Sequence, residues 1–209
     1  GIILKVLCRG AWMPFSKGWM YGCGEFGAEG LDHESLICKS YPDEWLKKES
    51  DGSWSPKYMF GIYSGEQTYG KHWDWFETEY TISDWVEASH NHQEWGVKKV
   101  TRAFRRMPRM NSFAIHLFID AWPNSWMKAI IDSERTPKPA WYAYREALTP
   151  LSIQVEAERS AFYSGESYPF QVWICNDTQS TPKATIRYQL ELNGKVLNTG
   201  IAYASISNV

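Results

Sequence analysis

The sequence has little of several features that would indicate a particular class of protein. It holds four cysteines in 209 residues and no C-x-x-C pair, so we interpret them as free thiols rather than a disulfide framework or a zinc site. Its formal net charge of −2 gives no electrostatic indication of a nucleic-acid or membrane partner. No apolar run approaches the length of a membrane span. We therefore expect neither partner, and oligomeric state and compartment stay open.

Aromatic residues and one glycine-rich segment stand out against this background. The chain has 12 Trp and 12 Tyr, and residues 19–31 read WMYGCGEFGAEGL. We predict a short strand over residues 17–21 that delivers Glu25 into a turn carrying Gly22, Gly24, Gly27 and Gly30. Glycines can adopt positive φ and let the backbone approach a ligand closely. A carboxylate presented in this way, in a chain so rich in aromatic rings, suggests chemistry on a sugar.

The same glycines also match a dinucleotide-binding motif, since Gly22, Gly24 and Gly27 spell G-x-G-x-x-G. That motif cradles a pyrophosphate only after a buried strand and before a helix. Residues 16–21 are not a continuous Val/Ile run, and Glu25 would place a negative charge beside the phosphates. The dinucleotide interpretation is therefore the weaker one. A structural glycine turn with a solvated Glu25 remains the simple alternative to a catalytic role.

Two stretches of the chain resemble glycoside hydrolase family 2, which contains β-galactosidases, β-mannosidases and β-glucuronidases. Residues 22–32, GCGEFGAEGLD, are similar to the segment that follows the family's seventh barrel strand, whose catalytic nucleophile corresponds to Glu25. Residues 113–123, FAIHLFIDAWP, and residues 135–148, RTPKPAWYAYREAL, resemble its eighth strand, Trp-Pro loop and last barrel helix. The resemblance implies a retaining exo-β-glycosidase acting on a carbohydrate substrate, β-galactosidase-like ahead of β-mannosidase- or β-glucuronidase-like. We expect no cofactor and no metal ligands in this sequence, and the metal dependence of the longer enzyme stays open.

One part of the family's catalytic apparatus has no counterpart in the sequence. A retaining glycosidase uses a nucleophilic carboxylate and an acid/base carboxyl group about 5–5.5 Å apart. The family's acid/base Glu follows an Asn well upstream of the nucleophile, but no Asn-Glu dipeptide occurs here. We therefore expect the chain to be a fragment of a longer enzyme, inactive by itself on natural β-glycosides. A non-catalytic carbohydrate-binding module is the alternative from another class.

The hydrophobic pattern predicts an α/β arrangement over residues 1–150. Apolar residues at helical spacing predict a long helix that begins at Thr81 or Ser83 and ends at Pro108. The other predicted elements are a helix from Asp32 toward Trp45 limited by Pro42, a functional loop over 47–76, a strand over 112–118 and a helix opened by Pro139. This succession is typical of the C-terminal part of a (β/α)8 TIM barrel.

Beyond Pro150 the hydrophobic pattern changes to alternation with a period of two. Leu151, Ile153 and Val155 alternate with other residues, and similar alternation recurs further along. The Asn193-Gly194 dipeptide is a strong signal for a two-residue hairpin. We predict that residues 151–209 form an incomplete, Ig-like antiparallel β-sandwich.

Beyond the Glu25 nucleophile, three residues are candidates for substrate binding. Trp122 offers a flat aromatic floor for a sugar ring at the C-terminal end of a barrel strand. Trp12 is a second candidate floor on the preceding loop. Asp120 either binds a hydroxyl group or braces its loop, and bracing is favoured. Glu29 is expected to brace the glycine turn through hydrogen bonds.

Other polar groups are assigned structural roles. The pair His90 and His92, and the run 32–34 (Asp-His-Glu), lack the ligand spacing of a metal site. We expect the two histidines to face solvent or pack within the long helix. We also expect the arginines at 102, 105, 106 and 109 to form a solvated helix face.

Overall fold

The computed structural model describes residues 18, 20–55, 81–157, 159, 161–178 and 181–206. The chain divides at Thr149 into two compact units. Trp12 and most of the predicted 47–76 loop lie outside the described residues. The assignment of residues 1–150 and 151–209 to a barrel part and a sandwich part stays a prediction.

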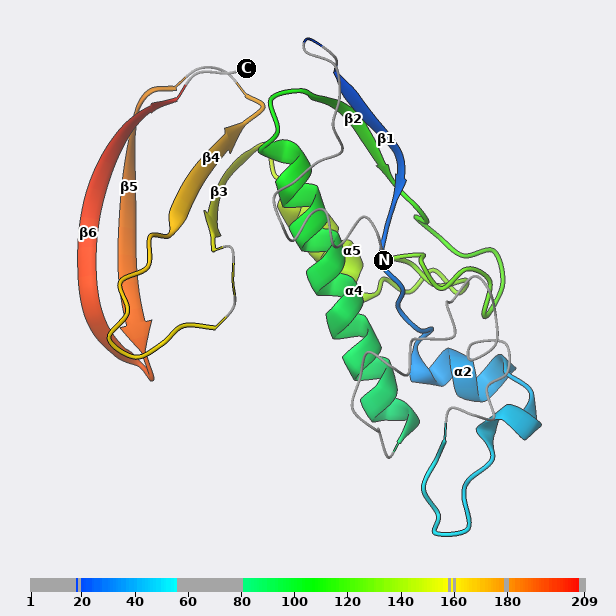
Figure 1. The fold of residues 1–209 in the computed structure, drawn as a ribbon. Coiled ribbons are helices and arrows are strands. Elements are labelled where there is room, and N and C mark those ends of the chain that lie inside the picture. Colours follow the sequence, from blue (N-terminus) through cyan, green and yellow to red (C-terminus); the bar gives the residue numbers. More distant parts are fainter. Residues whose placement is uncertain are drawn as a thin grey trace. The chain divides into compact units, whose positions relative to one another are not determined.

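Two parallel strands organise the described part of the first unit. Strands β1 (Tyr21–Phe26) and β2 (Met110–Ile115) run in the same direction side by side (Figure 1). The pairing is irregular between Cys23 and Phe26. It continues past the strand ends, where the His116 backbone N–H donates to the Phe26 carbonyl at 2.7 Å. The C-terminal ends of the two strands, and the segments that follow them, therefore meet at one edge.

The predicted strand over residues 17–21 is wrong, because β1 begins at Tyr21 and includes Glu25. Gly22 and Gly24 lie inside the strand although glycine disfavours strands, since β2 supplies the pairing that local propensity does not. The predicted positive φ is also wrong: Gly22, Gly24, Gly27 and Gly30 all lie outside the left-handed region.

Two of these glycines are needed for close approach between chain segments. A Cβ atom at Gly27 would lie 2.2 Å from the His116 carbonyl oxygen. A Cβ atom at Gly30 would lie 2.2 Å from the Gln93 Oε1 atom. The close approach that the sequence suggested for a ligand is thus made by the protein's own neighbouring groups.

The helices follow the sequence pattern closely. Helix α4 (Ile82–Arg105) begins after Thr81, whose hydroxyl accepts a hydrogen bond from the Asp84 backbone N–H at 3.1 Å. Helix α5 (Pro139–Ala147) has Pro in its first turn, where the missing N–H has no helical partner to lose. The two helices share a buried apolar cluster that includes Val97. The predicted capping and termination of the long helix are confirmed.

The predicted helix from Asp32 toward Trp45 is shorter than expected. Helix α2 (Glu34–Ser40) stops two residues before Pro42, and the 3-10 helix η1 (Asp43–Leu46) follows. The main apolar core lies between α2 and the first turns of α4. Its buried members are Leu31, Ile37, Tyr41, Trp54, Trp85, Val86 and Met127.

The second unit consists of antiparallel strand pairs. Strands β3 (Leu151–Glu156) and β4 (Gln171–Asn176) form one two-stranded sheet, and β5 (Thr181–Leu192) and β6 (Lys195–Ile206) form another. Asn193 and Gly194 connect β5 to β6 with φ values of 50° and 76°, as a type I′ hairpin turn requires. The predicted hairpin is confirmed.

Substitution of Gly27 tests the close approach at the strand ends. Gly27→Ala should destabilise the protein by on the order of 1–3 kcal/mol, because the new methyl group meets backbone that cannot turn aside. Gly24→Ala is the matched control, since nothing lies within 4 Å of a Cβ atom there. Thermal unfolding of both variants measures the difference. Equal losses of stability would contradict the proposed contact with His116.

Candidate functional site

Glu25 lies at the end of β1 with its side chain exposed. The next residue, Phe26, is buried and packs edge-on against Phe104 with ring centroids 5.1 Å apart. Successive residues of a strand face opposite sides, so burial of Phe26 directs the Glu25 carboxylate away from the core. The strand end is thus anchored by an aromatic ring while it presents an accessible carboxylate.

Glu29, four residues further along, is in a different environment. Its side chain is 3% exposed, and neither carboxyl oxygen has a hydrogen-bond partner among the described residues. Burial raises the pKa of Glu29 to about 8, with the charge of Lys128 acting in the opposite direction. Glu29 is therefore mainly a neutral acid near pH 7. The hydrogen bonds expected to brace the glycine turn are not formed with any of the described residues.

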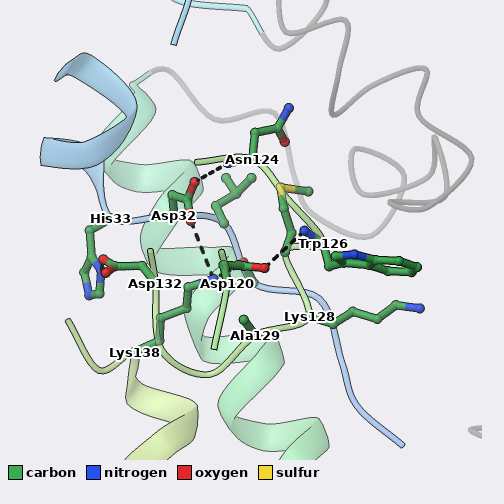
Figure 2. A network of polar contacts seen from close by, with 12 residues as sticks. Asp32, His33, Asp120, Asn124, Trp126, Lys128, Ala129, Asp132 and Lys138 are labelled. Atoms are coloured by element: carbon green, nitrogen blue, oxygen red, sulfur yellow. Dashed lines mark hydrogen bonds and ion pairs between the residues drawn. The ribbon is translucent and has the colours of Figure 1, made fainter. Parts of the chain in front are cut away.

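A buried network of an ion pair and hydrogen bonds connects the segments that follow β1 and β2 (Figure 2). Lys138 is fully buried, and its Nζ atom donates to the Gly30 carbonyl at 2.8 Å. The same Nζ atom lies 3.9 Å from Asp32 Oδ1. Asp32 Oδ2 accepts hydrogen bonds from the Tyr41 hydroxyl at 2.9 Å and from the Asn124 backbone N–H at 2.8 Å. This network joins three segments that are far apart in the sequence.

A contact between two further side chains extends the network. His33 Nδ1 lies 2.7 Å from Asp132 Oδ2, and the two side chains face one another in Figure 2. Asp132 Oδ1 accepts from the backbone N–H groups of Glu134 and Thr136, each at 2.9 Å. Asp32 and His33 therefore contribute to loop structure. In the described ranges, no group of three His, Cys, Asp or Glu side chains could hold a metal ion.

Asp120 is buried, with 1% of its surface exposed. Its Oδ1 atom accepts a hydrogen bond from the Trp126 backbone N–H at 3.2 Å, the contact drawn in Figure 2. Burial raises the pKa of Asp120, and the ammonium group of Lys138 partly offsets that effect. The contact is that of a residue bracing its own loop, the role favoured from the sequence, and binding of a substrate hydroxyl stays a prediction.

The loop after β2 exposes aromatic rings. Trp122 is 61% exposed, as a platform for a sugar ring requires. Trp126 is 36% exposed, and its ring lies edge-on to His116 with centroids 5.3 Å apart. Trp126 was not among the residues predicted from the sequence to bind substrate. The signal that could have identified it is a second Trp four residues after Trp122 in the same loop.

Several polar residues of α4 contact other parts of the protein, and His90 takes the second of its two expected roles. His90 is buried and its Nε2 atom lies 2.7 Å from the Leu31 carbonyl oxygen, so it packs rather than facing solvent. Burial lowers the pKa of His90 to about 4. Two of the arginines reach α5: Arg102 pairs with Glu146 at 2.8 Å, and Arg105 donates to the Ala147 carbonyl at 2.9 Å. The prediction of a solvated arginine face is therefore wrong at these two positions.

Glu25 is an exposed carboxylate at the C-terminal end of a parallel strand, which is where the active-site residues of (β/α)8 barrels lie. The class that the motifs indicate is glycoside hydrolase family 2. Comparisons with known proteins confirm that resemblance over part of the chain. No family model matches the chain. No helix of the described ranges is long and apolar enough to cross a membrane.

The particular relatives that match are β-mannosidases. Beta-mannosidase B of Aspergillus clavatus is 32% identical over 88 residues, which cover 39% of this chain and 10% of that protein. Beta-mannosidase B of Aspergillus flavus is 33% identical over the same coverage. The crystal structure of a β-D-mannosidase from Dictyoglomus thermophilum superposes with a TM-score of 0.52 at 16% identity. It covers 88% of this chain, which spans 23% of that structure, and the likeness shows the fold alone.

The buried acid Glu29 predicts a pH dependence of stability. A carboxyl group with a raised pKa stabilises the fold fully below its unfolded value of 4.5, and that contribution is lost as the pH rises through about 8. Between these values the free energy of unfolding should fall by up to about 1.4 kcal/mol per pH unit. Glu29→Gln should remove this slope.

Denaturant unfolding measured at intervals from pH 4.5 to pH 8 checks the prediction. The control is Glu87→Gln, because Glu87 is an exposed carboxylate on α4. This control should leave the slope unchanged. If Glu29→Gln and Glu87→Gln give the same slope as the parent, then Glu29 is not held as a neutral acid.

Proposed function

We propose that the protein containing this chain is a retaining exo-β-glycosidase of the family 2 type, with Glu25 as its nucleophile. The observation that carries the proposal is the exposed Glu25 carboxylate at the C-terminal end of β1, next to the anchored Phe26. An accessible carboxylate on a rigid strand can attack an anomeric carbon. The 22–32 motif supports the same assignment.

The described elements support a barrel origin for residues 1–150. Strand β1 is followed by α2, η1 and α4, and then by β2, which pairs with β1 in parallel. A strand, a crossover helix and a parallel strand are the repeating unit of a (β/α)8 barrel. We propose that β1 and β2 are the seventh and eighth strands, and that the acid/base carboxyl group comes from a strand outside this sequence.

The mechanism assigns separate tasks to the carboxylate and the aromatic loop. Glu25 attacks the anomeric carbon and forms a covalent glycosyl-enzyme while the acid/base group protonates the leaving oxygen. The same acid/base group then activates water, which releases the sugar and restores the Glu25 carboxylate. Trp122 and Trp126, in the loop after β2, provide apolar surfaces against which the C–H face of a sugar ring can lie.

Substrate preference is the part of the proposal that the comparisons change. The sequence motifs placed β-galactosides first, but the matching curated relatives are β-mannosidases. We therefore put β-mannosides ahead of β-galactosides as the substrate class. Assays of the full product of the gene on aryl β-mannoside, β-galactoside and β-glucuronide test this order directly.

Replacement of the nucleophile tests the central assignment. In the full gene product, Glu25→Gln should lower turnover by several orders of magnitude and leave the thermal midpoint unchanged, because covalent catalysis has no other group at that position. Glu34→Gln, another exposed carboxylate, is the control and should keep full activity.

Covalent labelling identifies the attacking atom independently. A 2-deoxy-2-fluoro glycoside slows hydrolysis of the glycosyl-enzyme and should label the peptide that holds Glu25. Mass spectrometry locates the label. Attachment at Glu29 would move the nucleophile to that residue, and binding of sugars without labelling or turnover would favour a carbohydrate-binding module.

Truncation of the exposed tryptophan tests the aromatic platform. Trp122→Ala should raise KM and lower kcat/KM by about tenfold or more, which corresponds to the loss of about 1.4 kcal/mol or more of aromatic contact. Its thermal midpoint should hardly move, because the ring is 61% exposed. A loss of about 3–5 kcal/mol of stability, as for a buried aromatic residue, would instead show that Trp122 belongs to the core.

A further inference from the structure

One face of α4 carries polar side chains that the mechanism above does not use. Ser89, His90 and Gln93 are all buried. Residues four apart lie on the same side of a helix, so Ser89 and Gln93 face the same neighbours. Burial of polar groups is unfavourable unless they form hydrogen bonds. A helix face that served only for packing would carry apolar residues there, as α4 does at Val97.

The side-chain amide of Gln93 contacts the segments that follow both strands. Its Nε2 atom lies 3.1 Å from the carbonyl oxygen of Ala28, which belongs to the segment after β1. It also lies 3.2–3.5 Å from three carbonyl oxygens of the segment after β2, those of Met127, Lys128 and Ala129. An amide nitrogen has two hydrogens, so these carbonyls share them. Gln93 thereby links the two segments through a single side chain.

The neighbouring residues of α4 hold the next part of the segment after β1. The Leu31 backbone N–H donates to Ser89 Oγ at 2.9 Å, and His90 Nε2 donates to the Leu31 carbonyl at 2.7 Å. Both backbone polar groups of Leu31 are therefore bonded to α4. The Gly30 backbone N–H donates directly to the Met127 carbonyl at 2.8 Å. The two segments are thus joined directly as well as through the helix.

We propose that Gln93 is a positioning residue for the reaction, assisted by Ser89. It holds residues 28–31, which follow Glu25, against residues 127–129, which follow the two exposed tryptophans. The link sets the distance between the nucleophile and the aromatic surface that holds the sugar. This inference rests on the proposed function, and it adds a residue that touches neither the substrate nor the reacting atoms.

The contacts of Gln93 explain why its loss would affect the reaction rather than substrate affinity. The residue acts on backbone carbonyls, so a change in its bonding shifts whole segments rather than one side chain. A displacement of about 1 Å at a reacting group can lower a rate by about 100-fold. The apolar surface of Trp122 would still accept a sugar ring. A defect in kcat with little change in KM is therefore the expected signature.

The test uses Gln93→Met in the full gene product, a change that keeps the volume and removes the amide. The control is Thr101→Val, because Thr101 is buried on the same helix and its hydroxyl donates within that helix, to the Val97 carbonyl at 2.7 Å, the one partner it has in the described part of the chain. Gln93→Met should lower kcat, and the rate of labelling by a 2-deoxy-2-fluoro glycoside, by about 10- to 100-fold with KM nearly constant. Thr101→Val should leave both rates within about twofold.

Hydrogen exchange provides a readout that does not depend on activity. In the unliganded protein, Gln93→Met and Ser89→Ala should speed amide exchange in the peptide covering residues 26–32, whereas Thr101→Val should not. Ser89→Ala, the milder change, keeps the inference testable if Gln93→Met does not fold. Unchanged exchange in residues 26–32 for Ser89→Ala would overturn the inference.

The outcomes separate this inference from the proposed function. If the parent protein is active and Gln93→Met keeps kcat at the level of Thr101→Val, Gln93 only packs and the inference is overturned. If the parent protein neither hydrolyses nor is labelled by any glycoside, the proposed function fails. In that case faster exchange in both variants would still support the positioning of residues 28–31, and unchanged exchange would overturn it.

Discussion

A buried ammonium group holds together the ends of the two parallel strands. Lys138 donates to the Gly30 carbonyl and faces Asp32 without any exposure to water. Isolation of a charge from water is strongly unfavourable unless an opposite charge and hydrogen bonds compensate it. Asp32 compensates the charge, and Tyr41 and Asn124 satisfy one of its oxygens. The segments after β1 and β2 and the start of α5 must therefore be in place together.

The acidic residues near this network lie in three kinds of environment: buried with a partner, buried without one among the described residues, and exposed. Asp32 is buried beside the Lys138 ammonium group, Asp132 is buried against the His33 ring, and both shape the loops. Glu29 is buried without a partner among the described residues, so its raised pKa keeps it mainly protonated near neutral pH. Glu25 alone, of these four, projects an accessible carboxylate from the end of a strand. Environment, rather than residue type, thus distinguishes the candidate nucleophile from its neighbours.

The sequence predicts the elements that local physics determines. The cap at Thr81, the stop before Pro108 and the Asn193-Gly194 hairpin depend on residues close together in the chain. The limits of β1 were not predictable in this way, because its pairing comes from β2, almost 90 residues later. Helix α2 ends at Ser40 rather than continuing toward Trp45, and the reason is local, because Pro42 follows two residues later.

The same division applies to the candidate site. Glu25 and Trp122 were selected from motifs, and the structure leaves both side chains exposed. The burial of Glu29 and the bond from Gln93 to the loops arise from contacts between distant segments. No spacing in the sequence reports such contacts. The resemblance identified a class of chemistry, whereas the arrangement that supports it required the three-dimensional structure.

The hydrogen bonds from α4 to the segments after β1 and β2 determine which residues of this sequence can be substituted. Gln93 and Ser89 bond to main-chain atoms of Ala28, Leu31 and residues 127–129. Every residue type offers the carbonyl oxygens, and every type except proline offers the N–H that Leu31 donates. Exposed side chains along the two segments can therefore be exchanged without loss of these bonds, whereas Gly30 cannot, because a Cβ atom there would meet Gln93. Ser89 and Gln93 cannot be exchanged in this way, because their side chains form the bonds. Side chains that can vary therefore lie on the segments after β1 and β2, whereas the side chains that fix the shape of these segments lie on α4.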